Sequence, residues 1–179
     1  MNDSLQLLAV RIREEVVDVA RVLERIEEGW RRAARTADDY YLDSVALNLH
    51  ALYTGLERIF ERIANRIDGG VPQGEDWHRK LLLQMTREVT GVRPAVISDA
   101  SRKGLEDYRG FRHVARNIYT FNLDPAKVER LALGARGCFI QVQAEVLAFA
   151  DFMAAAALRP EIREAGEDEM GKGDPSSPT

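Results

Sequence analysis

The sequence of 179 residues contains a single cysteine, Cys138, so it lacks an internal disulfide framework and the paired cysteines of a zinc site. It has no run of 18 apolar residues without charge and no basic leader in Met1–Val10, so we expect neither a transmembrane span nor a secretory signal. Glycine-rich phosphate-binding loops and serine nucleophile elbows are also missing. With 45% hydrophobic and 30% charged residues, the composition indicates a globular protein, which we expect in the cytoplasm.

Charge is distributed unevenly along the chain. Residues 161–179 hold six acids and two bases, whereas residues 1–160 hold 23 of each sign. The acidic segment follows Pro160 and has no apolar periodicity, so it cannot bury enough surface to offset its chain entropy. We therefore predict a folded domain over residues 1–158 and a disordered acidic tail over residues 159–179.

Apolar residues in the domain recur every three or four positions, which is the pattern of amphipathic helices. The first predicted helix follows Asp3-Ser4, and the second follows Asp38 and stops at residues 68–74. The other three are predicted from Asp76 to about Gly91, from Ser98 or Ser101 to Phe121, and onward from Asp124-Pro125. Because period-two alternation is missing, we predict an all-α, up-and-down bundle of about five helices.

The stretch that carries chemistry is residues 108–123, YRGFRHVARNIYTFNL, with three arginines, one histidine and no acid. On a helix, one side is apolar and the other side is cationic. The cationic side holds Arg109, Arg112, His113 and Arg116. Such a ridge suits a phosphate or carboxylate partner if it is exposed. In the alternative, its arginines pair with acids from neighbouring helices or a second subunit, and the sequence leaves both open.

The segment FRHVARNIY followed by LD resembles the signature of HepT-like proteins, toxins of the HEPN helical-bundle superfamily. Trp77-His78 and Arg93-Pro94 are spaced as in that group, and the resemblance is strongest from Trp77 to Asp124. It implies a metal-independent endoribonuclease with an Arg-x4-His-x-Tyr motif. It also implies a dimer whose two sites face each other, and an MNT-type nucleotidyltransferase antitoxin that places AMP on the motif tyrosine.

By that resemblance Arg112 occupies the arginine position and Tyr119 the tyrosine position, with Arg109 and Arg116 as added RNA-binding cations. Asn117 stands where the family has histidine. Asparagine can hydrogen-bond a phosphate, but it cannot exchange a proton at pH 7. Three alternatives follow: catalysis is lost, His113 replaces the motif histidine from a nearby position, or another group supplies the proton.

We therefore predict a HepT-like toxin-family protein that acts on RNA, with Arg112, Asn117 and His113 as candidate catalytic residues. The alternative is a non-catalytic dimeric bundle that binds an antitoxin-like nucleotidyltransferase or RNA; a purely structural bundle is a third possibility. No cofactor is predicted. Glu75-x-x-His78 matches half of a di-metal carboxylate pattern, but the sequence has no second such pair, so no metal site is predicted either.

Overall fold

The computed structural model describes residues 2–36, 38–117 and 122–158, although the side chains of Asn2, Arg116 and Asn117 fall outside this description. These residues form five helices and no strand. The helices are α1 (Asn2–Thr36), α2 (Asp39–Ile67), α3 (Trp77–Met85), α4 (Asp99–Asn117) and α5 (Pro125–Ala157). The prediction of an all-α bundle is thus confirmed, whereas the predicted tail over residues 159–179 lies outside the described residues.

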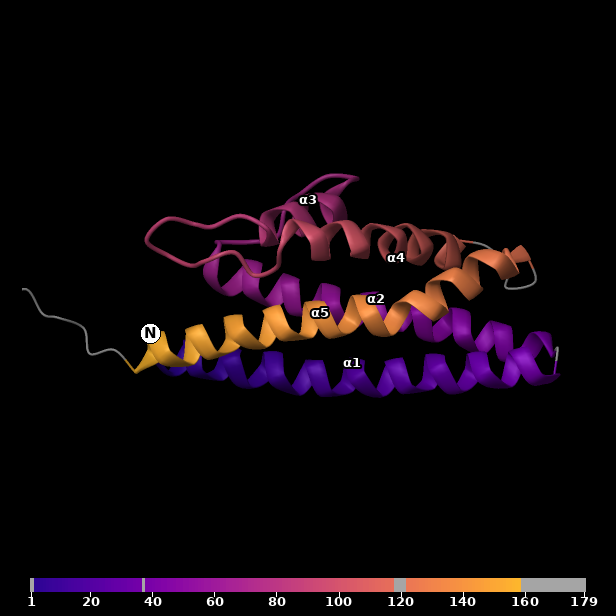
Figure 1. Cartoon of the computed structure of the whole chain (residues 1–179). Helices are drawn as coiled ribbons and strands as arrows, with labels where there is room; N and C mark the ends of the chain where they lie inside the picture. The colour runs from indigo at the N-terminus through magenta and orange to yellow at the C-terminus, as the bar shows by residue number, and fades with distance from the viewer. Residues whose placement is uncertain (1, 37, 118–121, 159–179) are drawn as a thin grey trace, which may run out of the picture.

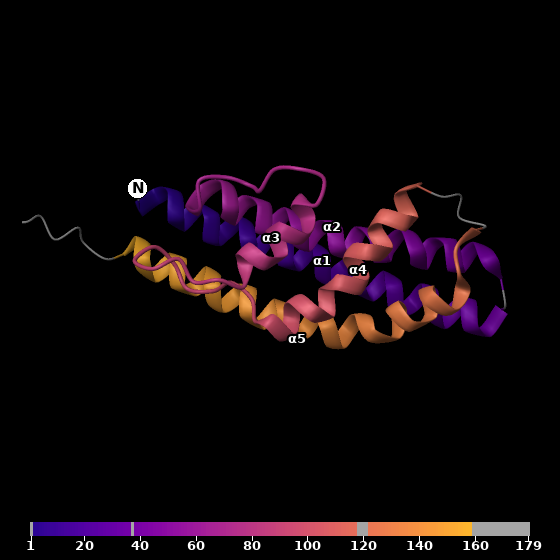
Figure 2. The ribbon, with the colours of Figure 1, turned by 90° about the horizontal axis from the view of Figure 1, so that it is seen from above.

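Three long helices and two short ones form the bundle (Figure 1). α1 packs along α2 and α5, and α4 lies on the opposite side of α2 and α5 from α1, with α3 next to it. Seen from above, α4 crosses obliquely over α2 and α5 (Figure 2). α2 is therefore covered on two sides, which explains why polar as well as apolar positions along it are buried.

Local sequence accounts for the boundaries of two helices. Asp38 caps α2 by accepting a hydrogen bond from the backbone N–H of Tyr40, and Asp124 caps α5 by accepting one from Ala126. A capping carboxylate satisfies a backbone donor that has no partner inside the helix, and Pro125 fits the first helical position because it lacks an N–H. The predicted starts of these helices are confirmed.

The third helix is shorter than its apolar spacing predicts. α3 ends at Met85, and Val89 instead pairs with Arg93 across a tight turn in which Gly91 has a φ of 74°. The carbonyl oxygen of Met85 accepts hydrogen bonds from Val96 and Ile97 rather than from a further helical turn. The backbone N–H groups of the following loop therefore bind the last carbonyl oxygen of α3, in place of the N–H groups of a further helical turn.

α5 is long and apolar enough, by length and composition alone, to cross a membrane. The same features suit a helix that packs in a protein core. Its buried side chains include Phe139, Val146 and Phe149, and it runs antiparallel to α1, with ion pairs Arg13–Asp151 and Glu27–Arg136. Core packing accounts for part of its apolar content, because 33% of its most apolar 18-residue window is buried in the bundle.

Candidate functional site

Arg112 on α4 lies at the centre of a polar cluster built from three helices. Its Nε donates to Thr54 Oγ1 at 3.3 Å, Nη1 lies 3.2 Å from His78 Nε2, and Nη2 forms an ion pair with Glu57 Oε2 at 3.1 Å. Thr54 and Glu57 belong to α2, whereas His78 is in the first turn of α3. We call these four residues the Arg112 cluster.

The contacts of His78 determine which ring nitrogen carries its proton. An arginine guanidinium only donates hydrogen bonds, so Nε2 of His78 must accept from Arg112 Nη1. The hydrogen of the neutral ring is therefore on Nδ1, which lies 2.5 Å from Glu57 Oε1 and donates to it. The ring of Trp77 lies against that of His78, with centroids 3.6 Å apart. The ring of His78 thus lies between a carboxylate and a guanidinium group, with Nδ1 facing Glu57 and Nε2 facing Arg112.

Glu57 is the most deeply buried charge of the cluster, with a side chain only 3% exposed. Burial raises the pKa of this carboxyl, and the positive charge of Arg112 acts against that rise. The cluster opens toward solvent at its other members, because the side chains of Arg112 and His78 are 16% and 23% exposed. The carboxylate is therefore a buried anchor, and the two nitrogen-bearing groups face the surface.

Tyr53 lies one helical turn before Glu57 and is fully buried. Its hydroxyl makes no hydrogen bond of good geometry to the residues that the structure describes. Burial raises the pKa of Tyr53, and the nearby charge of Glu57 raises it further. The phenol consequently stays neutral at physiological pH, and its proximity to Glu57 acts in the same direction as Arg112, lowering the pKa of that carboxyl.

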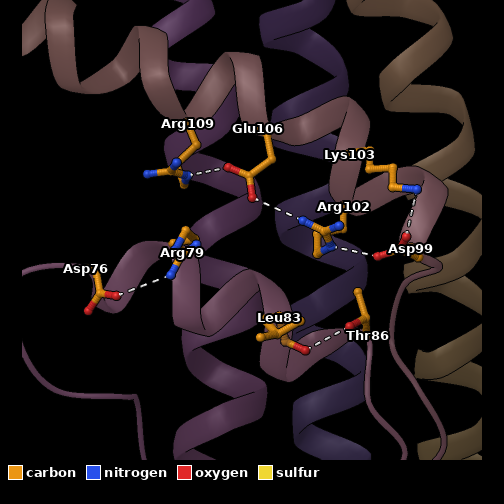
Figure 3. Close-up of polar contacts among 9 residues, drawn as sticks. All are labelled: Asp76, Arg79, Leu83, Thr86, Asp99, Arg102, Lys103, Glu106 and Arg109. Carbon is orange, nitrogen blue, oxygen red and sulfur yellow. Dashed lines mark hydrogen bonds and ion pairs between the residues drawn. The ribbon is translucent and has the colours of Figure 1, made fainter.

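Arg109 forms an ion pair within its own helix, so its charge is not left unpaired for a ligand. Its Nε contacts Glu106 Oε2 at 2.8 Å, and Arg102 bridges Glu106 and Asp99 farther back along α4 (Figure 3). Signs therefore alternate along this face of α4 from Asp99 to Arg109. Pairs of opposite charge three or four residues apart stabilise a helix, so helix stability alone favours this order of charges.

The predicted cationic ridge is thus not a row of exposed charges in its described part. Arg112 pairs with Glu57 of a neighbouring helix, as in the second alternative above, whereas Arg109 pairs with Glu106 of its own helix. His113 is exposed. The backbone of Arg116 and Asn117 is helical, but their side chains, and all of Tyr119, lie outside the described residues. The roles of Asn117, Arg116 and Tyr119 stay predictions.

Sequence reasoning missed Thr54 and Glu57 and gave His78 no role in the site. The available signal was a carboxylate at position 57 inside an apolar helix, four residues after Tyr53 and three before Phe60. An acid at a position expected to be buried needs a cationic or hydrogen-bonding partner, because an unpaired buried charge is unfavourable. Among the described residues, no group of three or more His, Cys, Asp or Glu side chains is placed to hold a metal ion.

Comparison with known proteins identifies the family. Residues 44–153 match the family described as HepT-like protein. The chain belongs to the HepT-like family. The matched span contains all four residues of the Arg112 cluster of this HepT-like protein.

A solved structure shares the fold of this HepT-like chain. It is a crystal structure of a mutant form of the toxin–antitoxin MntA–HpeT, with a TM-score of 0.58 and 22% sequence identity. The alignment covers 76% of this chain and 97% of the other. No curated protein matches the chain. At this identity the solved structure establishes the fold of the bundle, and the site has to be argued from its own residues.

Proposed function

We propose that this HepT-like protein is the toxin-type component of a HEPN/MNT pair and that it cleaves RNA without a metal ion. The observation that supports this most directly is Arg112: it occupies the motif position, and Thr54 and His78 fix its guanidinium at a partly exposed site. A guanidinium fork matches the oxygens of a phosphodiester and stabilises the charge that develops during cleavage.

Binding of RNA at this site requires an exchange of partners. The scissile phosphate would take over the Nη atoms of Arg112, which now contact Glu57 and His78. Thr54 would keep its hydrogen bond to Nε and so preserve the direction of the side chain. Glu57 would still accept the hydrogen bond from His78, so its buried charge would not be stranded.

An RNA cleavage assay in the presence of EDTA tests the proposal. We expect the purified protein to cut total RNA or tRNA, and Arg112→Ala to lower the rate by about 100-fold or more, because a stabiliser of transition-state charge is lost. Asn117→His, which restores the motif, should increase cleavage. Arg35→Ala, at an exposed arginine of α1 outside the cluster, is the matched control. Intact RNA with both the natural chain and Asn117→His would refute the proposal.

A second candidate function is binding without cleavage, and the ion pairs of Arg109 and Arg112 favour it, because both charges already have carboxylate partners. In that case the bundle binds RNA or an antitoxin-like protein, and Asn117 marks a degenerate active site. Salt-sensitive retention of RNA, with no cleavage by either the natural chain or Asn117→His, would select this alternative.

The proposal extends to two protein partners. One is a second copy of the chain in a homodimer. The other is an MNT-type nucleotidyltransferase, in keeping with the toxin–antitoxin named for the solved structure. We expect such a partner to place AMP on Tyr119 and thereby silence the site. Mass spectrometry after co-expression with a neighbouring nucleotidyltransferase should show the added mass on Tyr119, and an unmodified tyrosine would contradict this step.

A further inference from the structure

The proposed cleavage needs a group that accepts a proton, and Asn117 cannot do so at pH 7. We propose that His78, oriented by Glu57, is the general base of the HepT-like site and accepts the proton of the attacking 2′-hydroxyl. This inference rests on the proposed RNA cleavage. It is carried by the contact of Arg112 with Nε2 of His78 at 3.2 Å and by the contact of Glu57 with Nδ1 of the same ring at 2.5 Å.

The geometry of His78 is that of an oriented imidazole base. With the hydrogen on Nδ1 directed at Glu57, the lone pair of Nε2 is directed at Arg112. A carboxylate on the far side of the ring fixes the tautomer and stabilises the imidazolium that forms when Nε2 takes a proton. The lone pair therefore lies beside the group that is proposed to hold the scissile phosphate.

Arg112 covers the reactive nitrogen until substrate arrives. In the structure, Nη1 donates to Nε2, so the lone pair of His78 is occupied. A phosphate that draws Nη1 toward its own oxygens removes this hydrogen bond and exposes the lone pair within reach of the ribose next to that phosphate. Binding of the phosphate and uncovering of the base are then the same event, so the base acts when substrate is present.

The reaction balances without water or metal as a reactant. The 2′-oxygen forms a bond to phosphorus while the bond from phosphorus to the 5′-oxygen breaks. The proton of the 2′-hydroxyl moves to His78 Nε2, and the leaving 5′-oxygen takes a proton from solvent. His78 then returns its proton to solvent. The products are one RNA end with a 2′,3′-cyclic phosphate and one with a 5′-hydroxyl.

The charges around His78 support an imidazolium in this role. α2 supplies the carboxylates of Glu57 and Glu61, whose charges interact electrostatically with each other and, for Glu61, with His78. α4 supplies Arg112 and, nearby, Arg109. Once Arg112 neutralises the phosphate, the two carboxylates of α2 are left to balance the positive ring. The neutral Tyr53 adds no charge to this set.

His113, the alternative base from the sequence, lies next to Arg112 in the chain and therefore points about 100° away around the helix. It is exposed on α4, whereas His78 reaches Arg112 from α3. The two histidines can be separated by equivalent substitutions. Asparagine at position 78 keeps an amide N–H near the place of Nδ1, so the contact with Glu57 and the fold are preserved while Nε2 is removed.

The experiment measures kcat, KM and the pH–rate profile on a short RNA for the natural chain, His78→Asn, Glu57→Gln and His113→Asn, with EDTA present. We expect His78→Asn to lower kcat by about 100-fold or more with KM changed less than about threefold, and to abolish the acidic limb of the profile. Glu57→Gln should lower kcat less and move the acidic limb to lower pH. His50→Asn is the matched histidine control, and circular dichroism with thermal melting confirms folding of each variant.

Several outcomes would overturn the inference and identify which step failed. If His78→Asn cuts RNA as the natural chain does, or if His113→Asn alone loses the acidic limb, His78 is not the base although RNA cleavage stands. If His78→Asn weakens cleavage but keeps the acidic limb, His78 only positions Arg112. If neither the natural chain nor Asn117→His cleaves RNA, the proposed function fails and this inference with it; if only Asn117→His cleaves RNA, His78 is not the base. Ends other than 2′,3′-cyclic phosphate would exclude the mechanism.

Discussion

Two arginines of this protein pair with carboxylates on α2 or at its C-terminal cap, but their surroundings differ. Arg93 has a fully buried side chain and makes five hydrogen bonds: two to Asp68, both at 2.6 Å, and one each to the carbonyl oxygens of Gln84, Arg87 and Pro94. Arg112 is partly exposed, and one of its three partners is the titratable ring of His78.

The difference separates a structural ion pair from a candidate site. All five N–H donors of Arg93 are satisfied by acceptors of the chain, so a ligand could replace one of these acceptors only at the cost of an internal hydrogen bond. The bonds of Arg93 also hold the loop after α3 against the end of α2. The contacts of Arg112 are fewer, and two of them, to His78 and Glu57, involve groups whose charge depends on pH. A phosphate can replace such partners, because the buried carboxylate keeps a second hydrogen-bond donor in His78.

The largest expected effect of a single change on stability is at Arg93. Arg93→Ala leaves Asp68 buried without its charge partner and frees three carbonyl oxygens, so we expect a loss of about 3–5 kcal/mol in the free energy of unfolding. Guanidinium denaturation followed by circular dichroism measures this loss. A loss below about 1 kcal/mol would mean that the ion pair of Arg93 is not the structural contact that distinguishes it from Arg112.

The pH dependence of stability should be opposite for two carboxylates. Burial raises the pKa of Glu57, so its contribution to stability is present below the ordinary pKa and is lost as pH rises through the raised value. The hydrogen bond from Arg136 lowers the pKa of Glu27, so its contribution is present above the ordinary pKa and is lost as pH falls through the lowered value.

Differences between variants isolate these two contributions. As pH falls from 7 toward 4, the natural chain should gain stability relative to Glu57→Gln and lose stability relative to Glu27→Gln. Urea denaturation at several pH values measures both differences, and the effect should be smaller than that of Arg93→Ala. The same sign for both variants would show that burial does not dominate at Glu57.

The smallest expected effect is at Arg109. Its ion pair with Glu106 lies on the surface of a single helix and is partly exposed, so Arg109→Ala should cost no more than about 0.5 kcal/mol in the free energy of unfolding. In contrast, RNA affinity should fall and depend less on salt if this cation contacts phosphate. Thermal melting and an RNA-binding titration at two salt concentrations separate stability from binding.

The elements of the fold could be predicted because their signals are local. Asp38 and Asp124 mark helix starts through bonds to residues two positions away, and the apolar spacing between such caps defines the buried side. The prediction for α3 extended beyond Met85 because hydrogen bonds from Val96 and Ile97, which end the helix, come from residues that the local pattern does not include.

The candidate site was predicted only in part, for the same reason. Arg112 was found through the motif, and the pairing of Arg109 could have been read from Glu106 three residues before it. His78 lies 34 residues from Arg112 along the chain, and no spacing rule connects the two. The position of Glu57 on an apolar helix indicated burial, but its partners could be identified only once α4 was placed against that side of α2.

The sequence by itself determined the helices and their caps, because helical periodicity and capping depend on neighbours within one or two turns. It also singled out Arg112 through the motif. The packing of α4 across α2 and beside α3 decided what that arginine contacts. Only this packing buries Glu57, turns one nitrogen of His78 toward it and directs the other at Arg112. Burial and partner choice are properties of the assembled bundle, so the proton acceptor proposed for this site could not be recognised before the helices were in place.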